Sequence, residues 1–167
     1  MDDLARIALQ EERLQFERFD AGSAWSLGVR LKQAAETRQA AVAIDIQLHG
    51  QPLFFYAMPG TTPDNVEWVR RKRNVVMRFH QSSYAVGLKC LAQETTIYEK
   101  FALRTRDYVA HGGSFPLKLR GTGCVGTITV SGLPQREDHE LVVAVLAELL
   151  GHSAADLALD PSAAPTV

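Results

Sequence analysis

The chain has 167 residues, of which 46% are hydrophobic and 22% are charged, and its net charge is −1. This length and balance are typical of one globular domain with its own core, and the near-zero charge argues against nucleic acid as a partner. No apolar run approaches the ~20 residues of a membrane span, and residues 1–4 lack the basic start of a signal peptide, so we expect a cytoplasmic protein without membrane association. In that compartment Cys90 and Cys124 are expected to be reduced. No motif has metal-ligand spacing.

Helical and strand patterns alternate in the first third of the chain. Apolar residues recur at three- and four-residue spacing in two segments, and two later segments are short, apolar and separated by a turn. The expected elements are a helix over 2–18 that can bend into a short strand at 16–19, a helix from 22 or 23 to 38, a strand over 41–48, a turn at 49–52 and a strand over 53–57.

The remainder is predicted to be mostly helical, with one more pair of strands. Thr62 and Pro63 form a strong helix start, and Gly151 stands where helices commonly end. The expected elements are helices over 64–80, 84–92 and 94–110, a break at 111–113, strands over 115–119 and 124–130, a helix over 135–150, and a loose acidic tail over 152–167. Two hairpins make an antiparallel sheet, so we predict an α+β fold with one domain over residues 1–151.

The helix over 64–80 carries a basic run at residues 70–73. Lys72 and Arg73 are each three or four residues from Val69 and Val76, so they fall inside the apolar seam of this helix. A buried cation needs a partner. Two interpretations stay open. The two side chains snorkel or pair with acids at a subunit interface, or they hold an anionic ligand with help from Arg71.

Acidic and histidine side chains supply further candidates for the site. Asp138 shares the apolar face of the last helix, so it is a candidate partner for Lys72 or Arg73. His139 follows it, and His111 precedes two glycines and a serine. Either histidine is a candidate acid/base, because histidine titrates near neutrality; His111 is also a candidate metal or haem ligand or a plain turn residue.

The stretch Ala110-His111-Gly112-Gly113-Ser114-Phe115-Pro116 is the most informative of the chain. Glycine pairs allow close approach of backbone or positive φ, and the amides of Gly112, Gly113 and Ser114 can face an anion or a carbonyl. No P-loop, HExxH, GxSxG, zinc or haem-attachment motif is present. The glycines at 121, 123 and 126 match a dinucleotide spacing but lie between two expected strands, which excludes that interpretation.

Five blocks of the sequence resemble the haem-degrading-domain family, the GlcG/HbpS-like group, and within it a branch with HGGSFP and RRKRN blocks that includes a fungal cytoplasmic protein. The blocks lie at residues 49–65, 68–76, 111–116, 127–134 and 137–139, and the resemblance covers roughly residues 10–151. It implies a profilin-like fold with about five antiparallel strands flanked by helices, and homo-oligomers built from dimers.

Some relatives in this family bind haem or are linked to its breakdown, and others sit beside glycolate metabolism genes. The resemblance carries over two segments as pocket positions, 112–116 and 131–138, but it assigns no haem ligand to a particular residue. Three hypotheses follow. The protein holds a small anionic ligand, with haem as one candidate, near residues 111–116; it is an enzyme acting on haem or a small carboxylate; or it is a structural oligomer or adaptor.

Overall fold

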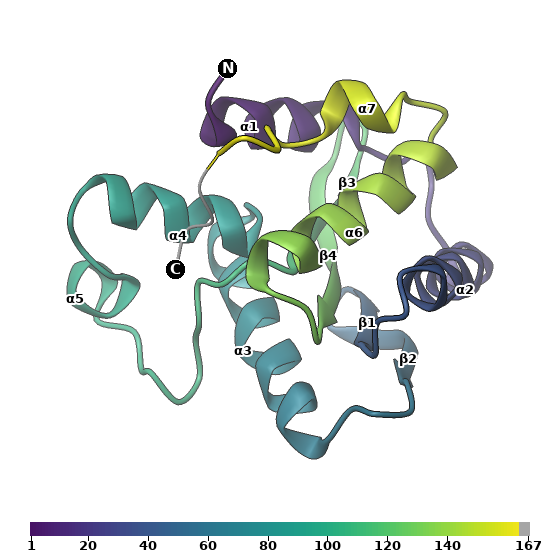
Figure 1. The fold of residues 1–167 in the computed structure, drawn as a ribbon, viewed down its shortest axis with the longest axis horizontal. Helices are drawn as coiled ribbons and strands as arrows, with labels where there is room; N and C mark the ends of the chain where they lie inside the picture. The colour runs from purple at the N-terminus through teal and green to yellow at the C-terminus, as the bar shows by residue number, and fades with distance from the viewer. Residues whose placement is uncertain (164–167) are drawn as a thin grey trace.

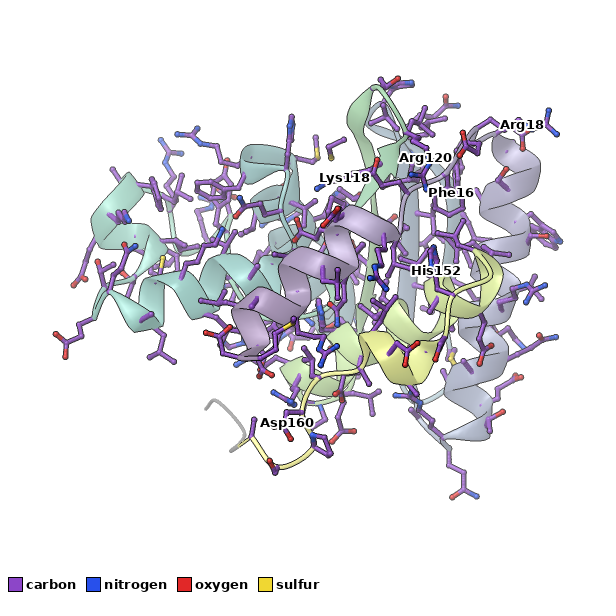
Figure 2. The ribbon with its side chains drawn as sticks, turned by 90° about the horizontal axis from the view of Figure 1, so that it is seen from above. Phe16, Arg18, Lys118, Arg120, His152 and Asp160 are labelled. Atoms are coloured by element: carbon purple, nitrogen blue, oxygen red, sulfur yellow. The ribbon has the colours of Figure 1, made fainter. Side chains whose placement is uncertain are left out.

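A four-stranded antiparallel sheet forms the centre of the computed structural model, which describes residues 1–163 (Figure 1). The strand order is β2-β1-β4-β3. The strands are β1 (Ala43–Leu48), β2 (Gln51–Ala57), β3 (Ser114–Leu119) and β4 (Gly123–Ser131). The predicted α+β class is therefore confirmed, with four strands in place of about five. The segment at 16–19 adds only one parallel bridge, from Phe16 to Leu119 beside β3 (Figure 2).

Two helices, α2 (Ala21–Thr37) and α6 (Gln135–Leu149), pack on one face of the sheet. Strand side chains alternate between faces, and those on this face are apolar. The main core buries, among others, Leu27, Leu31, Ile44, Ile46, Phe115, Leu117, Ile128, Val130, Leu141 and Leu146. Asp20 caps α2 and shares a capping box with Ser23, which is why the helix begins earlier than the predicted Gly22 or Ser23.

The opposite face of the sheet is polar, and α3 (Pro63–Phe79) covers it across β1, β3 and β4. Six buried polar side chains project from these strands: Asp45, Gln47, Ser114, Thr127, Thr129 and Ser131. Two pairs of them bond within the layer: Gln47 donates to Asp45 at 3.4 Å, and the hydroxyls of Ser114 and Thr129 lie 2.7 Å apart. The Thr127 hydroxyl has no partner among the described residues. The turn between β1 and β2 is only His49 and Gly50, both at positive φ. Pro52 consequently lies inside β2, where an edge strand tolerates a residue without an amide proton.

Residues 94–110 do not form the predicted single helix. After α4 (Ser83–Ala92), α5 spans only Ile97–Phe101 and ends at Ala102 in the left-handed conformation. The chain beyond it is irregular, because side chains of α3 bond to its carbonyl groups in place of a helix ladder. Arg71 donates to Thr105 O at 2.8 Å and Asn74 to Asp107 O at 2.7 Å.

The segment after Gly151 is ordered as far as it is described, contrary to the predicted loose tail. It forms α7 (Ala154–Leu157) and runs beside the first helix, α1 (Asp3–Arg13), as Figure 1 shows. Leu157 and Leu159 are buried, and Gln10 donates to Leu157 O at 2.6 Å. Figure 2 shows Asp160 beyond α7, where its carbonyl accepts a hydrogen bond from Arg136. Residues 164–167 of the predicted tail lie outside the described residues.

None of the described helices has the length and apolar character that crossing a membrane requires. Both cysteines are free thiols, as predicted.

Candidate functional site

A buried ion pair joins α3 to the start of α6. Lys72 Nζ lies 2.8 Å from Asp138 Oδ2, and the two side chains are 3% and 1% exposed. Asp138 also accepts from the amide of Leu133 at 3.0 Å. The helical spacing correctly predicted that Lys72 turns inward, and of the two candidate partners for Asp138, Lys72 and Arg73, the structure pairs it with Lys72. The pair joins two elements of the same chain.

Burial opposes both charges of this pair. It lowers the pKa of the Lys72 ammonium and raises the pKa of the Asp138 carboxyl, and each partner works against the shift of the other. Lys72 Nζ also lies 3.4 Å from the Val130 carbonyl and from the Ser131 hydroxyl. The ammonium therefore has several acceptors around it, and one of them, Ser131, lines the polar cleft described below.

The other two basic candidates have different positions. Arg73 donates to Asp45 Oδ2 at 3.0 Å and so binds α3 to the polar face of the sheet. The Arg71 guanidinium lies 5.2 Å from the Trp68 ring centroid and donates a hydrogen bond to the Thr105 carbonyl. Of the three predicted cations, Lys72 alone lines the polar cleft described below.

Gly112, Gly113 and Ser114 are buried, and their packing explains why glycine is needed. A Cβ on Gly112 would lie well under 3.0 Å from the Gln135 carbonyl oxygen, and one on Gly113 would overlap the Val130 carbonyl oxygen. Gly113 also has φ of +132°. The Gly112 amide donates to Gln135 Oε1 at 3.1 Å, and the Ser114 amide donates to a serine hydroxyl of α4 at 3.1 Å. These two amides bond within the protein, and the loop forms the support behind the site.

A polar cleft of about 230 Å³ opens beside the ion pair. It lies between the first turns of α3 and α6, and Pro134, the residue before α6, makes no side-chain hydrogen bond that caps this helix. Amides at a helix start favour negative charge. The lining residues are Asp64, Asn65, Trp68, Lys72, His111, Ser131, Gly132, Leu133 and Gln135.

His111 lies at the edge of this cleft. Its ring faces Trp68, with 5.3 Å between ring centroids and 30° between planes. Partial burial lowers the pKa of His111, and the positive charges of Lys72 and Arg71 lower it further. A neutral imidazole in this position can accept a proton from a ligand or donate a hydrogen bond to it.

A second cleft, of about 240 Å³, lies on the other side of His111, between α4, α5 and residues 109–111. His111 and Gln135 line both clefts. The walls of this one are largely apolar and include Tyr84, Leu88, Leu91, Ile97, Tyr98 and Val109.

A family model described as haem degrading protein HbpS-like matches residues 19–147. The chain belongs to the HbpS-like family. A UPF0303 protein of Azotobacter vinelandii is 59% identical over 158 residues, which cover 95% of each chain. The crystal structure of Ybr137w protein has 31% identity and a TM-score of 0.82, over 89% of this chain and 87% of that one. A PduOC:heme complex has 18% identity and a TM-score of 0.66, over 77% and 93%, and shows the shared fold.

In this HbpS-like chain His139 lies apart from both clefts. Its side chain is 1% exposed, between the rings of Tyr84 and Phe115. Burial, followed by the charge of Arg136, lowers the pKa of His139 to about 3. Of the two histidines predicted as acid/base candidates, only His111 reaches a cleft.

Three cleft residues of this HbpS-like chain were missed from the sequence: Asp64, Asn65 and Trp68; Ser131 and Gln135 fall in the segment 131–138 that the resemblance carried over as pocket positions. Trp68 precedes Lys72 by one helical turn, so the spacing offered a signal for it. Asp64 and Asn65 carry no signal, because they line a cleft only where the first turn of α3 meets the start of α6.

Proposed function

We propose that this protein binds a small carboxylate in the polar cleft. The observation that carries the proposal is the convergence of the Ser131 hydroxyl, the His111 imidazole and the start of α6 on one cleft. Hydroxyl, imidazole and backbone N–H groups are the donors that orient a carboxylate.

The electrostatics of the cleft support an anion. Asp138 balances the charge of Lys72, so the pair acts on a ligand as a dipole and not as a net positive charge. The positive end of this dipole, the Lys72 ammonium, lies beside Ser131. The charges that shift the pKa of His111 come from Lys72 and Arg71 and are both positive. Asp64 at the rim opposes them, and its carboxylate accepts from the Trp68 indole at 3.2 Å. A carboxylate is accordingly favoured next to His111 and away from Asp64.

Haem is the ligand that the family description suggests, and His111 is the residue of the site that would ligate its iron. Neutral imidazole is the ligating form, and apolar walls lie beside it. Each cleft, however, has a volume of 230–240 Å³, below the roughly 300–1,000 Å³ of pockets that bury a drug-sized ligand. The residues of one described chain therefore do not fit an enclosed haem, and a small carboxylate suits the polar cleft better.

Thermal unfolding with acetate, glycolate and hemin tests this proposal. A carboxylate at about 100 times its Kd stabilises the fold by about 2.7 kcal/mol, which raises Tm by roughly 5–10 °C for a chain of this size. We expect His111→Ala and Ser131→Ala to reduce the shift. The matched control is His152→Ala, at the far end of α6 (Figure 2), which should keep it. No shift with any acid would refute the proposal, and a Soret band with hemin that is lost in His111→Ala would replace it with haem binding.

A further inference from the structure

The polar and apolar clefts meet at His111, and Gln135 is held between them by its hydrogen bond from the Gly112 amide. We propose that the ligand is an amphipathic carboxylate, with its carboxylate in the polar cleft and a hydrocarbon tail in the apolar cleft. This inference rests on the proposed function and deepens it by naming the substrate class. A carboxylate without a tail would fill one cleft only.

The apolar cleft is built by close packing between α4 and the chain before His111. A Cβ on Gly87 would overlap the Ala110 carbonyl oxygen, so only glycine allows α4 to approach this segment. Ile97 and Cys90, both buried, belong to the apolar cluster beneath the cleft. The cleft therefore has an apolar base that can receive a hydrocarbon.

The lip of the apolar cleft is apolar as well. Leu91, near the end of α4, is 59% exposed and lines the cleft. Exposed leucines are ordinary when single, but this one stands on a cleft whose wall is already formed by Leu88, Ile97 and Tyr98. A hydrocarbon tail would cover it and remove its surface from water.

The two clefts adjoin at the ring of His111, which lines both. The His111 ring lies against Trp68, tilted by 30°, and both line the polar cleft. A tail leaving the carboxylate crosses the edge of the imidazole to reach Val109 and Ile97. This path also places Trp68 next to the ligand, so its fluorescence can report binding.

A series of straight-chain acids tests the inference: acetate, butyrate, hexanoate and octanoate, titrated into the full chain. The chain has two tryptophans, and Trp25→Phe leaves Trp68 as the single reporter. We expect affinity to rise about fourfold for each methylene that enters the apolar cleft. Leu91→Asp should lower the ratio of hexanoate to acetate affinity, because it places a charge at the lip. Met77→Asp is the matched control: Met77 is 51% exposed and lines neither cleft, so the ratio should be unchanged.

The outcomes separate this inference from the proposed function. Binding of all four acids with equal affinity overturns the tail site and leaves carboxylate binding intact. A rising series that Leu91→Asp does not alter also overturns it, because the tail then lies elsewhere. No binding of any acid overturns both.

Discussion

The buried imidazole of His139 makes the stability of the fold depend on pH. Gln10 donates through its amide nitrogen to Leu157 O, so its oxygen faces His139 and accepts from Nε2–H at 2.8 Å. Among the described residues Nδ1 has no partner. The ring is therefore neutral when folded, with its pKa lowered from 6.5 to about 3, while in the unfolded chain it binds a proton below about pH 6.5.

Below pH 6.5 the unfolded state binds more protons than the folded state, because the pKa of His139 is lowered only in the fold. The free energy of unfolding is therefore highest above pH 6.5 and falls as the pH drops from 6.5 toward 3. Each pH unit in this window costs about 1.4 kcal/mol, so wild type should lose about 2 kcal/mol from His139 by pH ~5. His139→Gln keeps a donor for Gln10 but does not titrate, and this part of the loss should vanish. Urea unfolding at about pH 8 and pH 5 measures the difference, with His152→Gln as the control. An equal loss in wild type and His139→Gln would show that the imidazole is not held neutral.

Three further substitutions test the packing around the site. Gly113→Ala should destabilise the fold by several kcal/mol, because the new Cβ would overlap the Val130 carbonyl oxygen. Gly121 has open space around it, so Gly121→Ala should cost only the roughly 1–2 kcal/mol of positive-φ strain. Lys72→Met leaves Asp138 buried without its cation and should cost about 3–5 kcal/mol, and Lys72→Met with Asp138→Asn should recover part of this. Leu157→Ala should cost about 2–5 kcal/mol, because its side chain is 1% exposed.

Denaturant unfolding measures all three, and each has its own contrary result. Equal effects of the two glycine substitutions would mean that Val130 does not constrain the loop. A double variant no more stable than Lys72→Met would mean that an unpaired carboxylate is not the cause. A loss under about 0.5 kcal/mol for Leu157→Ala would mean that the tail is loose after all.

Local periodicity predicted which side chains of a single helix point inward. It could not predict features that depend on contacts between residues far apart in the chain. Lys72 could be placed inward from its spacing to Val69 and Val76, and Asp138 from the apolar face of its own helix. His139 could not, because α6 is buried on several sides and the spacing does not say which neighbour each side meets.

The errors over 94–110 and 152–160 have a common cause. The carbonyls after α5 are satisfied by Arg71 and Asn74 of α3, and the segment at Leu157 is held by Gln10 of α1. Each partner is more than thirty residues away in the chain, so no local pattern can show it. The paired clefts arise in the same way, from the meeting of α3, α4, α6 and the loop at His111.

The helices on the two faces of the sheet should open locally on different timescales. Apolar packing holds α2 and α6 to one face, whereas α3 rests on a layer of hydroxyls and ion pairs that water can replace when the layer parts. Local opening begins where few apolar contacts are lost, so the amides of α3 should exchange with deuterium before those of α2. Because the polar cleft lies at the first turn of α3, an occupied cleft would slow this early exchange, and the exchange rate of the α3 amides would report the presence of the ligand.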